Sequence, residues 1–298
     1  MYEPIRYLMA LGGKRLRPML TLLAYQLYKD NPRDVIKYAV AVEAFHNFTL
    51  MHDDIMDKAP LRRGKATVHE KWDISTAILS GDVMLVKVYE MLLDIEDQKL
   101  KTVYKAFNRC ATEVCEGQQW DMEFEKHQTI AEAQYLRMIR QKTAVLLGFS
   151  LELGAILAGA SAADCELLRE FGINIGIGFQ LKDDLLDAYG DSKKFGKIVG
   201  GDIVANKKTF LLIKSLAVAD KRQHRELDYW LSAKKFDKTE KVSAVKEIYD
   251  ALSISRLTEK KINLYFKKGF NSFEKVDCPD KTKSILRRYT MQLIEREF

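Results

Sequence analysis

The feature that most restricts the fold of this chain is a long stretch without proline. No proline occurs between Pro60 and Pro279. Proline inside a helix removes a backbone hydrogen bond and clashes with the preceding turn, so its absence over this length favours helices. From Val35 to Met56, apolar residues recur every three or four positions and do not alternate as in a half-buried strand. We therefore predict an all-α protein of about ten or more helices.

The composition indicates a folded globular protein. Of the 298 residues, 47% are hydrophobic and 30% are charged, which is enough apolar surface for a large core and too much for general disorder. No segment has the composition of a long linker, so we expect a single helical domain over residues 1–298. The net charge of +6 suits an anionic small molecule as well as a polyanion and identifies no partner by itself. We interpret a lysine-rich tract at residues 233–238 as a solvated helical face.

Cysteine usage and the apolar segments bear on the location of the protein. The four cysteines are irregularly spaced and form no Cys-x-x-Cys pair, which favours a reducing cytosol over a disulfide framework. The N-terminal residues lack the apolar core of a signal peptide. The most apolar window, residues 144–163, has Glu152 at its centre, so we interpret it as a buried bundle helix and expect no transmembrane segment. We predict a cytoplasmic protein.

Two acidic clusters repeat the same pattern, two adjacent aspartates and a third aspartate four positions after the first. They lie at Asp53–Asp57 and Asp183–Asp187, each at the end of a strongly apolar helical stretch. On a helix, the first and last aspartates of each pattern share a face, where their charges repel and need a cation. Carboxylate oxygens, with no histidine or cysteine inside the pattern, favour Mg²⁺. Because the pattern recurs, we favour a metal site over solvated acidic helix ends.

Basic residues gather near these clusters. The Gly12–Pro18 segment combines three cations with two glycines, and Arg62 and Arg63 follow the first acidic cluster. Lys142 begins the most apolar helix, and two further lysines follow the second cluster, at Lys197 and Lys207. Arginine forks and lysine point charges suit diphosphate groups. We expect no nucleic-acid partner, because the neighbouring aspartates would repel a phosphate backbone.

In this order, the motifs resemble those of trans-isoprenyl diphosphate synthases of the polyprenyl synthetase family. The resemblance covers about residues 12–208 and includes a Phe-Gln-x-x-Asp-Asp-x-x-Asp motif at Phe179–Asp187. It implies the isoprenoid synthase fold, a helical bundle around a central cavity, usually as a homodimer. The implied activity is a Mg²⁺-dependent, head-to-tail condensation of isopentenyl diphosphate with an allylic diphosphate. In this reaction an allylic cation forms as diphosphate leaves, and no protein nucleophile is needed.

The resemblance also implies roles for individual residues. Six aspartates would hold a catalytic cluster of about three Mg²⁺ ions on the allylic diphosphate: Asp53, Asp54, Asp57, Asp183, Asp184 and Asp187. The leaving diphosphate would also contact Lys142, Arg62 and Lys197. Isopentenyl diphosphate would be bound by Lys14, Arg17, His46 and Arg63, with Phe179 near its hydrocarbon part. The reacting carbon would be lined by Thr143, Gln180 and Lys207, and a further cavity-lining motif contains Gln118 and Asp121.

Three residues before the first acidic cluster are candidates for setting product length. We expect the growing chain to run from the metals toward the N-terminal end of the Val35–Asp57 helix, past Thr49, Phe48 and Phe45. At 1.5 Å per residue, Phe48 lies about 7.5 Å below Asp53, which argues for a short product. We favour twenty carbons, geranylgeranyl diphosphate, with fifteen-carbon farnesyl diphosphate close behind. The alternative is that the two phenylalanines are ordinary core residues.

Other functions remain open from the sequence. A longer-chain polyprenyl diphosphate synthase, a terpene cyclase or a head-to-head synthase would use similar acidic helices, although the last two need no isopentenyl diphosphate site. A noncatalytic partner subunit and a metal-buffering bundle are alternatives of other classes. Relatives usually carry more residues before the Gly12–Pro18 segment, so we expect a short or truncated N-terminus.

Overall fold

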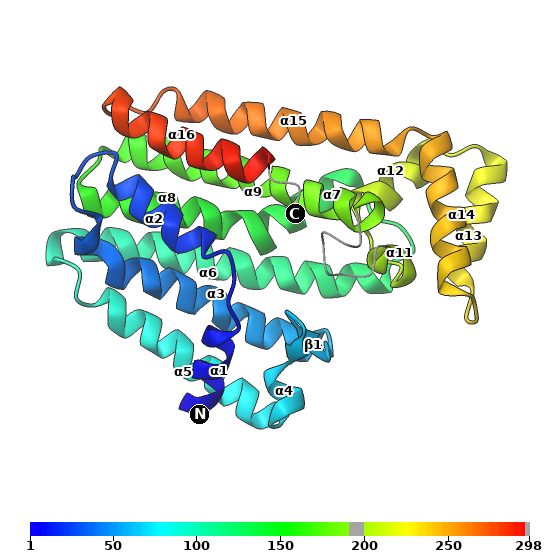
Figure 1. Cartoon of the computed structure of the whole chain (residues 1–298), viewed down its shortest axis with the longest axis horizontal. Helices are drawn as coiled ribbons and strands as arrows, with labels where there is room; N and C mark the ends of the chain where they lie inside the picture. The colour runs from blue at the N-terminus through cyan, green and yellow to red at the C-terminus, as the bar shows by residue number, and fades with distance from the viewer. Residues whose placement is uncertain (191–199, 296–298) are drawn as a thin grey trace. The chain divides into compact units, whose positions relative to one another are not determined.

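The computed structural model describes residues 1–190 and 200–295. Helices make up almost all of its regular structure, as predicted (Figure 1). The described strands are the two-residue β1 (Leu61–Arg62) and β2 (Lys65–Ala66), which pair antiparallel in a hairpin. The chain forms two compact units. Unit 1 comprises residues 1–111, 146–169 and 275–289, and unit 2 comprises residues 112–145, 170–274 and 290–298. The single domain over residues 1–298 stays a prediction.

Unit 1 is built around two adjacent helices. Its elements include α1 (Tyr2–Ala10), α2 (Leu16–Tyr25), η1 (Pro32–Val35), α3 (Ile36–Met56), α4 (Val68–Lys71), α5 (Ile74–Leu92), the first half of α6 (Asp97–Lys126) and α8 (Val145–Ala158). Helices α3 and α5 run side by side (Figure 1). Asp73 caps α5, because its side chain accepts a hydrogen bond from the backbone amide of Thr76 at 2.8 Å. This cap defines the residue at which the helix begins. Phe45 and Phe107 pack edge to face in the core, with ring centroids 5.1 Å apart.

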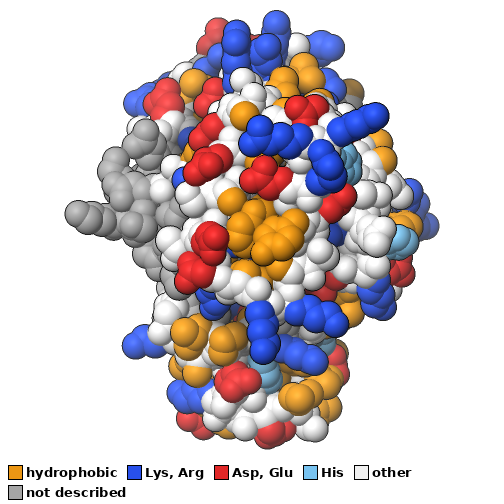
Figure 2. Space-filling model, turned by 90° about the vertical axis from the view of Figure 1, so that its right-hand side faces the viewer, with side chains coloured by type: hydrophobic (Ala, Val, Ile, Leu, Met, Phe, Trp, Pro, Cys, Tyr) orange, Lys and Arg blue, Asp and Glu red, His pale blue; other side chains and the backbone are white. Residues whose placement is uncertain are grey.

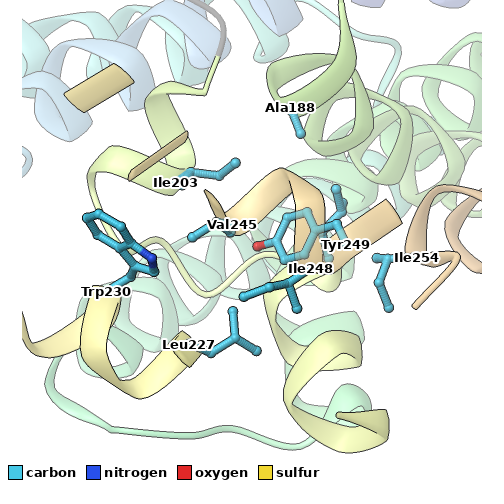
Figure 3. Close-up of a cluster of buried hydrophobic side chains, with 9 residues drawn as sticks. Ala188, Ile203, Leu227, Trp230, Val245, Ile248, Tyr249 and Ile254 are labelled. Carbon is cyan, nitrogen blue, oxygen red and sulfur yellow. The ribbon is translucent and has the colours of Figure 1, made fainter. Parts of the chain in front are cut away.

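Unit 2 contains most of α9 and the helices that follow it. Its elements include α7 (Glu132–Ile139), the π-helical turn η2 (Arg140–Ala144), α9 (Ala162–Tyr189), α11 (Gly201–Val204), α12 (Phe210–Val218), α13 (Lys221–Ser232), α14 (Lys238–Ala251) and α15 (Ile254–Phe273). The last helix, α16 (Asp280–Glu295), contributes to both units. Figure 3 shows a buried cluster that contains Ile203 of α11, Trp230 of α13 and Tyr249 of α14. This cluster ties α11 to the α13–α14 pair.

The described residues contain one stretch that is apolar and long enough to cross a membrane. It is Glu132–Ala158, and 89% of its apolar window is buried inside the protein. Glu152, which interrupts the stretch, accepts hydrogen bonds from Arg109 at 2.7 Å. These features are those of a core helix, as predicted.

On the surface, the face viewed in Figure 2 mixes acidic and basic side chains among its described residues. The lysines of the 233–238 tract are exposed, as predicted. The predicted helical face is wrong, because residues 233–237 form the connection between α13 and α14 and only Lys238 is helical. A mixed surface of this kind favours solubility and does not offer a continuous basic track on the face in view.

Candidate active site

The first aspartate motif lies at the C-terminal end of α3 in unit 1. Asp54 is 2% exposed and accepts hydrogen bonds from Arg62 Nε at 2.8 Å and Arg62 Nη2 at 2.7 Å. This bidentate pair is a strong, geometrically defined interaction, and the β1–β2 hairpin returns Arg62 to the helix end to make it. Asp53 is half-buried and Asp57 is exposed. The motif therefore has one carboxylate directed into the protein and two on its outer side.

A basic cluster, which we define as Arg15, Arg17, Arg62 and Arg63 around His46, occupies the same unit. Burial lowers the pKa of His46 well below its usual value. The charges of all four arginines lower the same pKa further, so the imidazole is neutral. The acidic partner of the cluster is Glu43, which is 6% exposed and accepts a hydrogen bond from Arg15 at 2.5 Å. The local excess of positive charge suits an anionic ligand.

Two arginines of this cluster are positioned by the Gly12–Pro18 segment. Burial lowers the pKa of Arg17 to about 10, partly offset by the charge of Glu43. The buried Nε of Arg17 has no hydrogen-bond partner among the described residues. Arg63 donates to the carbonyl of Gly12, and a Cβ at Gly13 would lie only 2.9 Å from its guanidinium. The φ of +134° at Gly13 is one that residues with a side chain rarely adopt, so this position favours glycine. Lys14 beside it is exposed.

The second aspartate motif lies near the end of α9 in unit 2. Asp184 is 4% exposed and accepts hydrogen bonds from the Tyr135 hydroxyl and from Gln180 Nε2, the latter at 3.1 Å. Burial raises the pKa of Asp184 to about 7, although both hydrogen bonds oppose the shift. Asp183 is exposed. Asp187 is half-buried, and its carboxylate accepts a hydrogen bond from the backbone amide of Asp202 at 2.9 Å. As in the first motif, the second aspartate points inward.

The predicted Lys142–Thr143 helix start forms the π-helical turn η2, which packs against α6. A Cβ at Gly117 would lie 2.2 Å from the backbone nitrogen of Lys142, so only glycine allows this approach. Lys142 Nζ donates to Asp121 Oδ2 at 2.5 Å. Thr143 Oγ1 donates to Gln180 Oε1 at 3.2 Å. Unit 2 thus joins the predicted residues of α6, η2 and α9 through polar contacts, and π-helical turns often occur at functional sites.

Lys207 is the cation of unit 2 that lies among carboxylates. Its side chain is 49% exposed, and its Nζ is 3.8 Å from Asp202 Oδ1. Burial by itself lowers the pKa of Lys207, but the carboxylates around it prevail and raise that pKa: Asp202, Asp184, Asp121 and Asp183. The ammonium is therefore charged and close to the second aspartate motif.

Phe179 and Gln118 are the remaining predicted residues of unit 2 that the structure describes. Phe179 packs edge to face on Phe266, with ring centroids 5.8 Å apart. Gln118 is 6% exposed, and neither of its amide atoms has a hydrogen-bond partner among the described residues. An unsatisfied buried amide is costly, so it marks a place where a ligand or water is expected to bind. Lys197 lies outside the described residues.

The product-length candidates form an aromatic column in unit 1. Phe45 is 1% exposed and Phe48 is 9% exposed, and their ring centroids are 5.7 Å apart. The column continues through Phe107 to Phe149, whose ring centroids are also 5.7 Å apart. Thr49 is half-buried and donates through Oγ1 to the His46 carbonyl at 2.8 Å. The small Thr49 and the bulky Phe48 are thus adjacent on α3, between Asp53 and the buried Phe45.

The donor set fits Mg²⁺ chemically. Outer aspartates offer carboxylate oxygens, the ligands this ion prefers, and the buried Nε of Arg17 remains available for an anion. In the described part of the chain, no three His, Cys, Asp or Glu side chains already converge on one metal position. Mg²⁺ usually binds one or two carboxylates together with water and substrate phosphates, so a preformed cage is not required.

Sequence reasoning missed several residues of these sites. Tyr135 and Glu43 are buried polar groups that hold Asp184 and Arg15, respectively. The backbone amide of Asp202 donates a hydrogen bond to Asp187, and the Asp202 carboxylate is 3.8 Å from Lys207 Nζ. The signal available for Glu43 was an acidic residue inside an apolar helix, whereas Tyr135 had none, because its partner is far away in the sequence.

Taken together, a helical fold and two aspartate motifs with nearby cations define a class of enzymes that act on diphosphates with metal ions. A family model described as polyprenyl synthetase matches residues 1–252. A geranylgeranyl diphosphate synthase of Methanosarcina mazei is 37% identical over 302 residues, covering 100% of this chain and 90% of that protein. The chain therefore belongs to the polyprenyl synthetase family, whose members are prenyltransferases.

Other relatives and solved structures agree. A short chain isoprenyl diphosphate synthase of Methanocaldococcus jannaschii is 44% identical over 228 residues, which are 76% of this chain and 69% of that protein. The crystal structure of a geranylgeranyl pyrophosphate synthase shares 43% identity and a TM-score of 0.95, covering 100% of this chain and 92% of the other. The predicted isoprenoid synthase fold and short-chain trans-prenyl diphosphate synthesis are confirmed.

Proposed function

We propose that the main product of this enzyme is the twenty-carbon geranylgeranyl diphosphate, formed from isopentenyl diphosphate and a shorter allylic diphosphate. The observation that carries the product length is the buried Phe48–Phe45 pair one to two helical turns before Asp53. Relatives named geranylgeranyl diphosphate synthase support it. Farnesyl diphosphate is the nearest alternative on the shorter side. On the longer side, two relatives are named geranylfarnesyl diphosphate synthase.

We further propose that the aspartates bind Mg²⁺ with the allylic diphosphate. The outer carboxylates of Asp53, Asp57, Asp183 and Asp187 would contact the ions, and the inward Asp54 and Asp184 would hold the motifs in place. Bound Mg²⁺, about three ions, would neutralise the diphosphate as the carbon–oxygen bond breaks. Lys142 and Arg62 would bind the departing diphosphate, exchanging part of their present contacts with Asp121 and Asp54. We propose that Lys197 also binds the departing diphosphate, on the basis of the sequence motif alone.

The basic cluster would hold isopentenyl diphosphate. Arg17 has a buried Nε ready to donate, and Arg63 and Lys14 add positive charge. Neutral His46 adds a hydrogen-bonding group without changing that charge. In unit 2, we propose that Phe179 contacts the hydrocarbon part of this substrate and that Thr143, Gln180 and Lys207 face the reacting carbon. Gln118 and Asp121 would line the same cavity, and exclusion of water would protect the cation.

Product analysis tests the proposed reaction. The purified chain is incubated with Mg²⁺, labelled isopentenyl diphosphate and, in turn, dimethylallyl, geranyl and farnesyl diphosphate. We expect a discrete C20 diphosphate from each primer, and removal of Mg²⁺ by a chelator should abolish its formation. Diphosphate release that does not depend on isopentenyl diphosphate would instead indicate a cyclase. Inactive folded protein whose activity is restored by a second chain would indicate a noncatalytic subunit.

We also propose that the enzyme is a cytoplasmic homodimer. The four cysteines, which all lie in the described part of the chain, form no disulfide with one another, which suits a reducing compartment. Helix α5 and the residue that follows it leave large apolar side chains exposed at intervals that place them on one side: Ile74, Ile78, Val86 and, just after the helix, Leu93. An uncovered apolar face of this kind favours association with a second copy.

The dimer proposal predicts that charge on α5 breaks association. The double variant Ile78→Glu and Val86→Glu should run as a monomer in size-exclusion chromatography with light scattering, because two buried carboxylates would oppose the apolar contact. Leu264→Glu on α15, at a position 44% exposed, is the matched control and should leave the dimer intact. A dimer that survives the α5 double variant would place the interface elsewhere.

A further inference from the structure

A buried lysine in unit 2 is not accounted for by the proposed mechanism. Lys241 of α14 is 1% exposed, and its Nζ donates to Asn206 Oδ1 at 2.6 Å. The same ammonium is 3.5 Å from the Val204 carbonyl and 4.3 Å from the centre of the Phe236 ring. These described contacts of the ammonium are to an amide oxygen, a backbone carbonyl and an aromatic ring, and none is to a carboxylate. Burial, and to a lesser degree the charge of Lys208, lowers its pKa. Such a group persists in a core only where its contacts are specific.

The partner of this lysine, Asn206, has an uncommon backbone conformation. Its φ is +55°, in the left-handed region that asparagine tolerates better than most residues. Its backbone amide donates to the Ile203 carbonyl at 3.2 Å and ends α11. Its side chain is held from two directions, because Nδ2 donates to the Leu231 carbonyl at 3.0 Å while Oδ1 accepts from Lys241. Helices α13 and α14 therefore both fix this residue.

The next residue along the chain is Lys207. Its backbone amide donates to the Asp202 carbonyl at 2.9 Å, so the left-handed turn at Asn206 determines where the Lys207 side chain leaves the backbone. A cavity of about 20 Å³ is lined by Asn206, Lys241, Lys207 and Asp187 among others. The turn that carries Lys207 thus lies between the second aspartate motif and the buried ammonium.

The α13–α14 pair is a suitable support for this turn. In Figure 3, Leu227 and Trp230 of α13 and Val245 and Ile248 of α14 belong to the same buried cluster as Ile203, which is three positions before Asn206. Side chains packed this closely have few alternative arrangements, so they hold α11 and its C-terminal turn in one place.

We propose that Lys241 and Asn206 are positioning residues, forming a clasp that aims the ammonium of Lys207 at the reacting substrates. This inference rests on the proposed role of Lys207. It assigns a function to α14, where the sequence contains no recognisable motif. The clasp acts through geometry alone, because Lys241 is buried behind the turn and Lys207 is the residue directed toward the carboxylates.

A double-mutant cycle tests the clasp. Lys241→Met keeps the length of the side chain but removes the donor, and we expect kcat to fall roughly tenfold, because displaced catalytic groups lose rate steeply. KM for both diphosphates should stay within about twofold. In a Lys207→Ala background, the same substitution should change kcat less than about twofold, since the group it positions is already gone. Lys238→Met, at an exposed position of α14, is the matched control and should leave kcat unchanged.

The outcomes separate the two proposals. Equal losses from Lys241→Met in both backgrounds, or no loss in the wild-type background, would overturn the clasp. Full activity in Lys207→Ala alone would overturn the proposed role of Lys207. Should Lys241→Met melt below the assay temperature, Asn206→Gly replaces it, because glycine keeps the left-handed turn but removes both side-chain contacts. We expect the same kcat loss from that variant, and wild-type kcat would again overturn the clasp.

Discussion

Asp53→Asn is expected to lower kcat at least about a hundredfold while leaving the melting temperature near that of the wild type. Asp53 is on the outer side of the first motif, so the substitution removes a charge offered to Mg²⁺ without opening the core. Labelled product formation gives kcat, and thermal unfolding followed by circular dichroism gives stability. We also expect half-maximal activity to require more Mg²⁺, because one ligand has become neutral.

Asp54→Asn is the matched comparison, one position along the same helix. The Asp54 side chain is 2% exposed, and its neutralisation leaves the Arg62 guanidinium without a charged partner. Breaking a buried pair in this way costs about 3–5 kcal/mol of unfolding free energy, discounted here because the Arg62 side chain is 25% exposed. Asp54→Asn should therefore lower the melting temperature, which Asp53→Asn leaves near that of the wild type. Wild-type kcat in Asp53→Asn would remove Asp53 from the proposed metal ligands.

Phe48→Ala is expected to lengthen the main product from C20 to C25 or beyond. Phe48 and Phe45 are three residues apart on α3, about 4.5 Å along the axis, which is close to the length of one isoprene unit. Removing the upper ring opens that depth, and Phe45 then becomes the floor. Thin-layer or mass-spectrometric analysis of dephosphorylated products measures the shift. The double variant Phe45→Ala and Phe48→Ala should lengthen the product again.

Loss of stability has to be separated from this change in product. Removing a buried phenylalanine costs about 3–5 kcal/mol. Phe171→Ala, at a 1% exposed position stacked on Phe273 in unit 2, carries a similar cost and should leave product length unchanged. An unchanged product distribution in Phe48→Ala would place the floor elsewhere and leave Phe48 as an ordinary core residue.

The comparison of sequence and structure shows which kinds of feature a pattern can predict. The helices of α3 and α9 and the aspartate motifs on them follow from local periodicity, because i and i+4 spacing is a property of a single helix. The orientation of each motif did not follow from it. Asp54 points inward because of Arg62 on a hairpin, and Asp184 because of Tyr135, which is 49 positions away. Such partners are chosen by tertiary packing, which no local spacing encodes.

The lysines show the same limit. Those of the 233–238 tract are exposed as predicted, but Lys241, only three positions later, is buried. The turn at Lys142 is π-helical. The residue that allows its close packing is Gly117 on another helix, and the need for glycine there is evident only when the two backbones are known to meet. Residues that position others are therefore harder to predict than residues that carry charge to a substrate.

The neutral His46 among four arginines has a consequence for acid and alkaline conditions. With the pKa of His46 well below its usual value, acidification toward pH 6 adds no proton to this ring. On the alkaline side, burial lowers the pKa of Arg17 to about 10, so this group keeps its charge at neutral pH. Between these limits neither His46 nor Arg17 changes its charge. Over that interval His46 and Arg17 therefore act as a constant part of the electrostatic field that a diphosphate meets.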